Sequence, residues 1–204
     1  DLVLRKLRAA DGTPGVADEV LGLPVHCYDA HPEEALRGTA GEIIAQRDGA
    51  ICRATRDGAV WITHLKDSHD PARPFKLPAA MVLGERLRAV PTERLAVDAP
   101  HAARSWREIY YEEHEDVGVL HFPFYNGAMS TAQCERLTAA YREATRRPTK
   151  AIVLAGGPDF WSNGIHLNVI EASSQPAEES WRNINAIDDF VLTLLTTATH
   201  MTVA

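Results

Sequence analysis

Apolar runs and turn residues alternate along the first half of this chain in a pattern typical of short strands. Residues 16–65 hold five short apolar runs, which are separated by glycine, proline and two Asp-Gly pairs. An Asp-Gly pair between apolar runs is a strong hairpin signal, because glycine accepts a positive φ. Strands this short and this closely spaced predict a small, strongly curved antiparallel β-barrel or sandwich. The predicted strands are residues 16–21, 25–28, 41–46, 51–54 and 60–65.

The apolar positions of these runs predict the interior of the β unit. Helical spacing predicts a flanking helix over residues 1–10 and a shorter one over residues 79–88. The apolar face of the first helix would consist of Leu2, Val3, Leu4 and Leu7. The predicted interior residues of the β unit are Val16, Val20, Val25, Ile43, Ile51, Val60, Ile62 and Leu65.

The second half of the chain combines strands with two long helices. Strand-like runs over residues 107–113 and 117–124 precede Ser130, a good N-cap for a helix over residues 131–147. The unbroken apolar run at residues 151–154 predicts a strand buried on both faces, and the strand-helix-strand order favours parallel pairing. A second long helix is predicted over residues 177–196, and residues 200–204 have the composition of a starting strand. The predicted inward-facing helix residues are Cys134, Leu137, Ala140, Tyr141 and Ala144, then Trp181, Ile184, Ile187, Phe190, Val191, Leu194 and Leu195.

Residues 90–106 lack clear periodicity, and we interpret them as a linker between a first domain (1–89) and a second domain (107–204). Apolar residues make up 45% and charged residues 24% of the chain, which is typical of globular proteins. The net charge is −7 and neither half is basic, which argues against a nucleic-acid partner. No apolar run is long enough to span a membrane and no signal peptide opens the chain, so we expect a cytoplasmic protein without a membrane partner.

Cysteine and histidine spacing gives no sign of a metal site. The three cysteines are far apart and predict reduced structural thiols, and four histidines of the first half are expected at the surface. These residues are Cys27, Cys52 and Cys134, and His26, His31, His64 and His69.

The stretch from Lys150 to Glu171 carries the strongest chemical signal. Its apolar strand runs into the breaker cluster of residues 155–159 and then into a predicted helical turn. A strand that ends in a glycine-rich turn before a helix leaves backbone N–H groups unpaired, and these can receive an anion or a developing oxyanion. The alternative interpretation is an ordinary strand-loop-helix connection.

The same stretch resembles the first half of the crotonase (enoyl-CoA hydratase/isomerase) fold. Members of that family carry a G-x-x-F-x-x-G-x-D/x-L turn, and this chain has Gly157, Phe160, Gly164 and Leu167 at the matching positions. The turn at residues 126–129 is similar to the family's N-A-L/M turn. The resemblance covers residues 107–204 and implies the first layers of a ββα spiral.

The resemblance also implies a site for a CoA thioester. The N–H of the residue after the second glycine would be an oxyanion donor, which assigns that role to Ile165 next to Gly164. His166 stands where many crotonases have Asp, and it is either a structural loop residue or a polar group near the thioester. The residues expected to border CoA are Ser162, Asn163, His166, Leu167, Asn126, Gly127 and Met129; Ser162 and Asn163 have turn formation as their alternative role.

Residues 8–15 and the short strands that follow resemble the C-terminal OB-like domain of formyltetrahydrofolate-dependent formyltransferases. A formyltransferase C-terminal domain joined to a crotonase-like domain resembles the HypX/HoxX-type hydrogenase maturation family. That resemblance implies transfer of a formyl group from formyltetrahydrofolate to CoA, followed by release of carbon monoxide from formyl-CoA for a nickel–iron hydrogenase. The implied cofactors are CoA and formyltetrahydrofolate, without a metal. The implied partners are a CoA thioester, hydrogenase maturation proteins and the hydrogenase large-subunit precursor.

The chain is expected to be an internal segment of a longer enzyme with little turnover alone. By the resemblance, the formyltransferase catalytic residues precede Asp1, and the second oxyanion donor and the acid/base side chains follow Ala204. Two other functions stay open: an enoyl-CoA hydratase/isomerase with an accessory domain, and a non-catalytic crotonase-like scaffold.

Several conspicuous residues have simpler interpretations. Trp161 and Trp181 are predicted core or loop anchors. The acidic run at residues 112–116 is interpreted as a solvated turn. The basic residues Arg5, Lys6 and Arg8 are interpreted as a solvated helix face, with contact to a CoA phosphate as the alternative.

Overall fold

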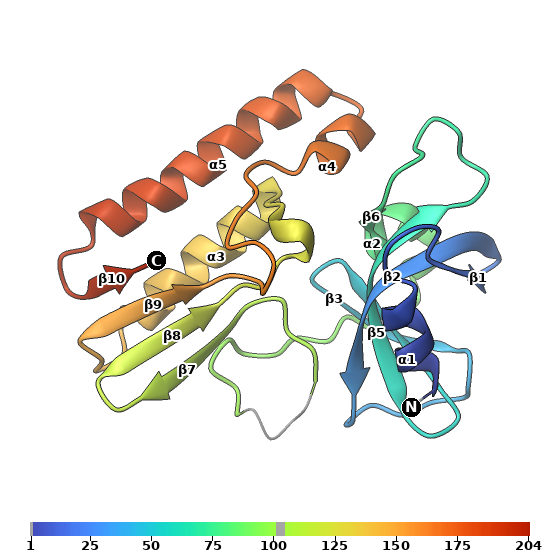
Figure 1. Ribbon diagram of the computed structural model, residues 1–204, viewed down its shortest axis with the longest axis horizontal. Coiled ribbons are helices and arrows are strands. Elements are labelled where there is room, and N and C mark those ends of the chain that lie inside the picture. The colour runs from blue at the N-terminus through green and yellow to red at the C-terminus, as the bar shows by residue number, and fades with distance from the viewer. Residues whose placement is uncertain (1, 101–104) are drawn as a thin grey trace. The chain divides into compact units, whose positions relative to one another are not determined.

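The computed structural model describes residues 2–100 and 105–204, which form two compact units (Figure 1). Unit 1 comprises Asp1–Leu95 with Pro100–Trp106, and unit 2 comprises Ala96–Ala99 with Arg107–Ala204. Asp1 of the predicted first helix and residues 101–104 of the predicted linker lie outside the described residues. The domain boundaries at residues 89 and 107 stay predictions.

Unit 1 is an antiparallel sheet flanked by short helices. Its strands lie in the order β1-β2-β5-β4-β3, and β6 pairs with β5. The predicted hairpin turn between β3 and β4 is confirmed, because Asp48 and Gly49 both have positive φ there. The elements are α1 (Leu2–Ala9), β1 (Val16–Val20), β2 (Leu23–Glu33), β3 (Ile43–Arg47), β4 (Ala50–Ala54), β5 (Ala59–Asp67), β6 (Leu77–Pro78), α2 (Ala79–Leu83) and a 3₁₀ helix (Gly84–Leu87).

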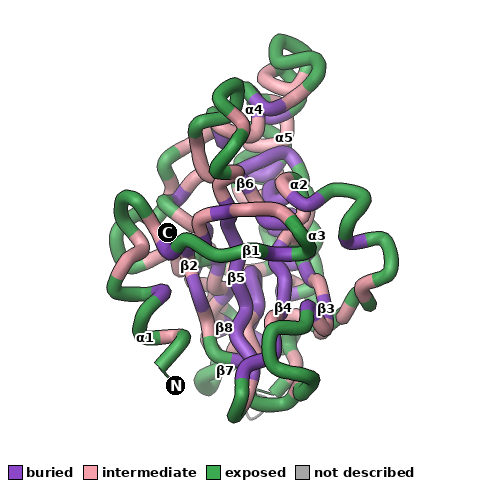
Figure 2. The backbone as a smooth tube through the Cα atoms, turned by 90° about the vertical axis from the view of Figure 1, so that its right-hand side faces the viewer, coloured by how far each residue is buried: buried purple, intermediate pink, exposed green. Residues whose placement is uncertain are grey.

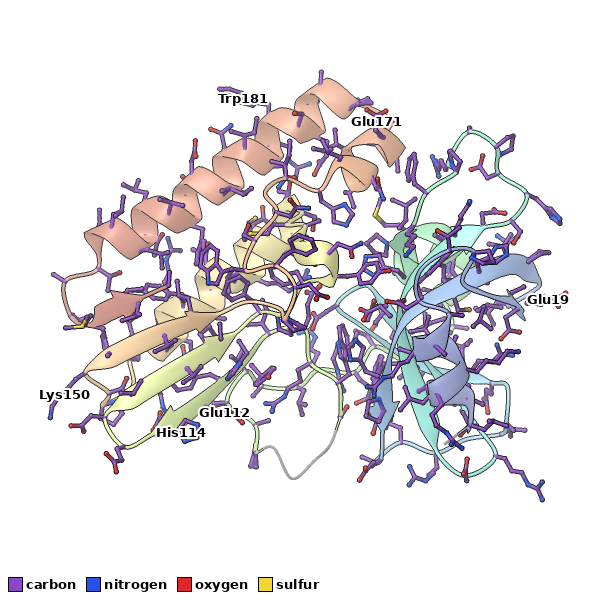
Figure 3. The ribbon with its side chains drawn as sticks, in the orientation of Figure 1. Glu19, Glu112, His114, Lys150, Glu171 and Trp181 are labelled. Atoms are coloured by element: carbon purple, nitrogen blue, oxygen red, sulfur yellow. The ribbon has the colours of Figure 1, made fainter. Side chains whose placement is uncertain are left out.

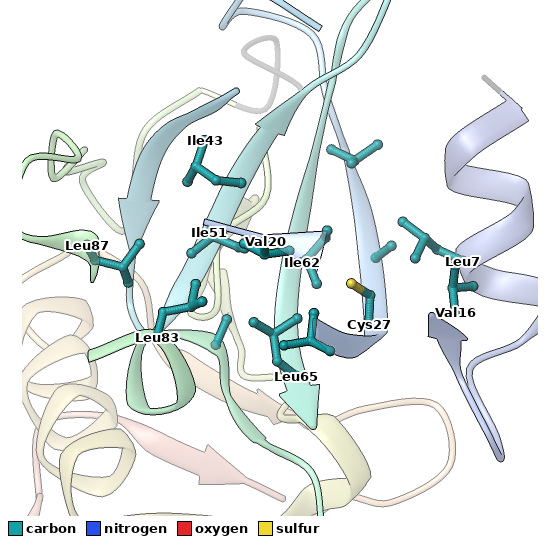
Figure 4. Close-up of a cluster of buried hydrophobic side chains, with 14 residues drawn as sticks. Leu7, Val16, Val20, Cys27, Ile43, Ile51, Ile62, Leu65, Leu83 and Leu87 are labelled. Carbon is teal, nitrogen blue, oxygen red and sulfur yellow. The ribbon is translucent and has the colours of Figure 1, made fainter. Parts of the chain in front are cut away.

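The core of unit 1 contains every interior residue predicted from the strand pattern (Figure 4). The prediction for α1 is wrong in part: Leu7 is buried and Leu4 partly so, but Leu2 is 74% exposed and Val3 is exposed as well. This short helix packs on β2 through Leu7 and Leu4, which are one turn apart, so only one edge of its apolar face is covered. Arg5, Lys6 and Arg8 are exposed, as a solvated helix face requires.

A buried carboxylate organises the polar interior of unit 1. Glu33, at the end of β2, is 2% exposed and accepts four hydrogen bonds. Oε2 accepts from Trp61 Nε1 at 2.7 Å and from Ser105 Oγ at 2.5 Å. Oε1 accepts from the backbone N–H groups of Ala35 and Leu36. The carboxylate therefore ties strand β5 and residue 105 to the end of β2.

Unit 2 is a four-stranded sheet with helices packed on it. Its strand order is β10-β9-β8-β7, with β7 antiparallel to β8 and with β8, β9 and β10 mutually parallel (Figure 1). The predicted parallel pairing of the strands before and after the first long helix is confirmed. The elements are β7 (Tyr110–His114), β8 (Val117–His121), a 3₁₀ turn (Tyr125–Gly127), α3 (Thr131–Ala144), β9 (Ala151–Ala155), α4 (Leu167–Ala172), α5 (Pro176–Thr196) and β10 (Met201–Val203).

The N-terminus and apolar stripe of α3 match the sequence prediction. Ser130 forms a capping box with Gln133: its Oγ accepts from the Gln133 N–H, and its own N–H donates to Gln133 Oε1. All five predicted stripe residues of α3 are buried. Burial of β9 on both faces is wrong, because only Ile152 and Leu154 are buried. Helices α3 and α5 share the core on one face of the sheet, so the alternate residues of β9 are only partly covered.

The predicted inward face of α5 is too wide. Phe190 is buried and Ile187 and Leu194 pack against the core, as predicted. Trp181, however, is 68% exposed and points away from the unit (Figure 3), and Ile184, Val191 and Leu195 are exposed as well. One helix face can contact the sheet, so the remaining apolar residues form a second, outward stripe.

The described histidines and cysteines differ in how well they follow prediction. His64 is buried on β5 with Nδ1 2.7 Å from Thr63 Oγ1, so its predicted surface position is wrong; His69 is exposed. All three cysteines are buried and unpaired, and burial raises the pKa of each thiol to about 12. They are therefore protonated at neutral pH and unsuited to nucleophilic chemistry.

Candidate functional site

Two turns of unit 2 that are far apart in sequence meet through backbone hydrogen bonds. The Met129 N–H donates to the Gly164 carbonyl at 2.9 Å, and the Asn163 N–H donates to the Gly127 carbonyl at 2.7 Å. Met129 and Ile165 form a parallel β-bridge. The turn before α3 and the glycine turn after β9 are thus joined into one structure, which we call the paired turns (residues 126–129 and 162–166).

Gly127 is the residue that allows this close approach. Its φ is +66°, in the left-handed region that favours glycine. A Cβ atom at this position would lie 2.7 Å from Phe160 Cβ and 3.0 Å from the Asn163 backbone nitrogen. The predicted turn before α3 therefore requires glycine for both backbone conformation and space.

The geometry of one peptide determines where the Ile165 N–H points. In a trans peptide the carbonyl of one residue and the N–H of the next point in opposite directions. The Gly164 carbonyl points toward Met129, from which it accepts a hydrogen bond. The Ile165 N–H consequently points away from the turn at residues 126–129. Within residues 2–100 and 105–204 it meets no hydrogen-bond acceptor, and the residue is half-buried.

The other predicted site residues surround this peptide in different ways. Ser162 Oγ accepts from the Gly164 N–H at 3.2 Å and lies 3.1 Å from Met129 Sδ, so it supports the turn. Asn163, Leu167 and Asn126 have exposed side chains at the rim of the paired turns. Contact of any of these residues with CoA stays a prediction.

His166 is placed as a helix cap. It is 6% exposed, and Nδ1 accepts a hydrogen bond from the Val169 N–H at the N-terminus of α4. Nδ1 can accept only when the ring is neutral at that nitrogen. Burial lowers the pKa of His166 below its ordinary value of 6.5. This placement supports the structural alternative for His166.

Loss of the His166 cap should be measurable as a change in stability. His166→Ala should lower the free energy of unfolding of unit 2 by about 1 kcal/mol, whereas His166→Asn keeps an N-cap acceptor and should cost less. Because the folded pKa is depressed, the unfolded chain binds the proton first, so wild-type stability should fall as pH drops below 6.5. Urea unfolding at several pH values should show this component removed in His166→Asn. The same substitution at exposed His69 is the control, and equal pH dependence in both variants would contradict the assignment.

Asn183 joins the site from α5 and was missed by sequence reasoning. Its side chain is 1% exposed, with Nδ2 donating to the Met129 carbonyl at 2.8 Å and Oδ1 accepting from the His166 N–H at 3.1 Å. The available signal was its position, four residues before Ile187 and seven before Phe190. That spacing places a polar amide on the inward stripe of a helix.

Comparison with known proteins finds relatives along nearly the whole chain. Residues 2–75 match the family described as formyl transferase, C-terminal domain. Over 202 residues the chain is 47% identical to the hydrogenase maturation factor HoxX of Bradyrhizobium diazoefficiens, covering 99% of this chain and 34% of HoxX. It is 50% identical to HypX from Aquifex aeolicus in a crystal structure with tetrahydrofolic acid, with a TM-score of 0.94 over 98% of this chain and 35% of HypX. The chain belongs to the HypX/HoxX family.

The HypX match confirms the predicted fold class of an antiparallel β unit followed by ββα layers. The chain spans about a third of the length of the HypX/HoxX relatives it matches. In the described part of this family member, no helix is both long and apolar enough to cross a membrane. Nor do three His, Cys, Asp or Glu side chains among those residues gather closely enough to hold a metal ion.

The glycine turn of this HypX/HoxX chain is held to the sheet by Trp161. The indole Nε1 donates to the Leu154 carbonyl at 2.9 Å, and the ring meets Phe122 edge-on. The Gly157 N–H donates to the Phe160 carbonyl and closes the tip of the loop. Trp161 is therefore a loop anchor, one of the two roles predicted for it.

Proposed function

We propose that the polypeptide containing this chain moves a formyl group from formyltetrahydrofolate to CoA and then releases carbon monoxide from formyl-CoA. The carbon monoxide would serve as a ligand of a nickel–iron hydrogenase centre. In the release step the formyl C–H and C–S bonds break, an S–H bond forms on CoA, and carbon monoxide leaves. Atoms and electrons balance without an external oxidant or reductant.

The observation that carries this proposal is the Ile165 N–H. It projects from the paired turns without an acceptor among the described residues, on a chain 50% identical to HypX. A fixed backbone N–H aimed at a thioester carbonyl stabilises negative charge on that oxygen at no cost in reorganisation. Gly164 supplies the peptide that orients this N–H. The rim residues Asn126, Asn163 and Leu167 would border the CoA path.

The remaining assignments follow from the relatives. Formyltetrahydrofolate would bind in a domain that precedes this chain in the longer polypeptide. The support is the tetrahydrofolic acid bound to HypX and the match of residues 2–75 to a formyl transferase C-terminal domain. We further propose CoA thioesters and hydrogenase maturation proteins or the large-subunit precursor as partners, a cytoplasmic location, and no resident metal.

Hydrogen exchange of the full-length polypeptide tests the thioester site. A formyl-CoA analogue should slow exchange of the Ile165 N–H, and CoA alone should slow it less because CoA has no carbonyl to accept the bond. The β3–β4 turn at Asp48-Gly49 is the internal control and should not change. CoA binding without protection of residues 160–167 would refute the site. No CoA binding at all, in calorimetry, would refute the function and favour a scaffold.

The substrate is tested separately by turnover. Formyl-CoA should release carbon monoxide at a rate well above background, and crotonyl-CoA should not be hydrated. The reverse pattern would replace this proposal with an enoyl-CoA hydratase/isomerase activity.

A further inference from the structure

The Ile165 residue is fixed at both of its peptides, and the two bonds come from different elements. On its N-terminal side, the Gly164 carbonyl accepts from the Met129 N–H in the turn before α3. On its C-terminal side, the His166 N–H donates to Asn183 Oδ1 on α5. Two fixed peptide planes leave Ile165 little freedom to turn its N–H.

The Asn183 amide also closes the second side of the paired turns. Met129 and Ile165 form a parallel β-bridge, whose first pair is the Met129 N–H and the Gly164 carbonyl. The next pair of groups that face each other is the Met129 carbonyl and the His166 N–H. Asn183 reaches both, because Nδ2 donates to the Met129 carbonyl while Oδ1 accepts from the His166 N–H. One side chain thereby bonds to both turns.

Few side chains could do this from the same place. The position needs one donor and one acceptor on the same short side chain, in a site from which water is excluded. Asp lacks the donor, and Leu lacks both groups. Packing of Ile187 and Phe190 against the unit 2 core holds α5 in place, so the amide is carried by a fixed helix.

We propose that Asn183 is a positioning residue that aims the Ile165 N–H at the thioester carbonyl. Its two hydrogen bonds set the spacing of the paired turns and the plane of the peptide after Ile165. Asn183 does not touch the substrate; it acts through the backbone. We call the two hydrogen bonds of Asn183 to the paired turns the Asn183 clamp. The clamp itself rests on geometry alone, whereas its role in catalysis rests on the proposed function.

The sharpest variant is Asn183→Asp, which keeps the shape and the acceptor but removes the donor to the Met129 carbonyl. In the ligand-free full-length protein, exchange of the Ile165 and His166 amides should rise while β8 and β9 stay protected. With formyl-CoA, kcat should fall by about 10²-fold and KM should change much less, because misplacement of a catalytic group by about 1 Å has that effect on the chemical step. Asn183→Gln, which keeps both groups, should recover part of the loss.

Asn185→Asp is the matched control, two residues along the same helix. The Asn185 amide donates to the Trp181 carbonyl within α5 and reaches neither turn. This variant should leave exchange and kinetics at wild-type values. The proposal is overturned if Asn183→Asp behaves like Asn185→Asp, or if it loosens all of unit 2 uniformly.

Hydrogen exchange of the ligand-free protein tests this inference separately from the proposed function, because the measurement uses no CoA. Local loosening in Asn183→Asp, in a protein whose wild type binds no CoA thioester, would support the clamp and refute the function. Protection of Ile165 by a formyl-CoA analogue, with unchanged kcat in Asn183→Asp, would support the function and refute the positioning role of Asn183.

Discussion

Glu33→Ala should lower the free energy of unfolding of unit 1 by about 3–5 kcal/mol. The substitution leaves four donors without their acceptor: the buried Trp61 Nε1, and the part-buried Ser105 Oγ and backbone N–H groups of residues 35 and 36. The same network includes Arg47, which donates to Ser105 Oγ and to the Trp106 carbonyl and lies 4.6 Å from the centroid of the Trp61 ring. Ser105 Oγ connects the two side chains, because it donates to Glu33 and accepts from Arg47, so loss of Glu33 also removes the acceptor that orients this hydroxyl.

The same carboxylate should make unit 1 sensitive to acid. Burial alone would raise the pKa of Glu33, but hydrogen bonds from Ser105, Trp61 and two backbone amides hold it below its ordinary value of 4.5. The folded pKa is therefore the lower one. The stabilisation is complete above pH 4.5 and is lost as pH falls through the folded pKa. The pKa of Asp29 is also lowered, so Asp29 contributes to the same pH dependence of stability, but a Glu33 variant keeps that contribution.

Urea-dependent hydrogen exchange of the β5 amides measures this effect in unit 1 alone. In Glu33→Gln the free energy of unfolding should depend less on pH below 4.5, because the side chain no longer titrates. The variant should also be less stable at neutral pH, because its amide NH2 group would face hydrogen-bond donors. Glu19→Ala removes an exposed carboxylate from β1 and is the matched control (Figure 3), with an expected change within about 0.5 kcal/mol. Similar losses in Glu33→Ala and Glu19→Ala would contradict the role of the network.

The unit 1 core could be predicted from sequence because its signals are local. Alternating apolar residues and the Asp48-Gly49 turn set both the strands and the face that each side chain occupies. Strand β5 is buried along most of its length (Figure 2), because Val60 and Ile62 enter one apolar cluster and Trp61 enters another. A run of apolar residues predicts such burial without stating which cluster each residue joins.

The Glu33 network and the Asn183 clamp could not be predicted in this way. Both depend on pairs far apart in sequence, such as Glu33 with Ser105 and Asn183 with Met129. Periodicity reports how apolar a position is and carries no information on hydrogen-bond partners. For the same reason it assigned Trp181 to the interior of α5, although an apolar residue on a helix need not face the sheet.

The paired turns fall between these cases. The resemblance that selected residues 126–129 and 160–167 also implied that both border one ligand, and the structure joins them by backbone bonds. For His166, sequence left a structural and a functional role open, and its hydrogen bond to the start of α4 supports the structural one. Chemistry that depends on a backbone N–H leaves little trace in side-chain identity, so Ile165 was found through its glycine neighbour.

Gly156→Ala should disrupt the glycine turn more than any other single methyl group added to it. A Cβ at Gly156 would lie 2.4 Å from the Trp161 carbonyl oxygen and 2.6 Å from Trp161 Cα, and backbone atoms cannot move aside cheaply. The expected loss is about 1–3 kcal/mol in the free energy of unfolding of unit 2. Displacing Trp161 would break its bond to the Leu154 carbonyl and its contact with Phe122.

The neighbouring glycine supplies the control for crowding. A Cβ at Gly157 would meet the Phe160 carbonyl oxygen at 3.4 Å, an ordinary contact, so Gly157→Ala should change stability by no more than about 0.5 kcal/mol. Hydrogen exchange should show residues 160–167 loosened in Gly156→Ala only. Because Trp161 directly precedes Ser162 and the paired turns, the same variant should also weaken binding of a formyl-CoA analogue. Equal behaviour of the two variants would mean that the turn is not held by its close approach to β9, and that Trp161 does not set the position of Ile165.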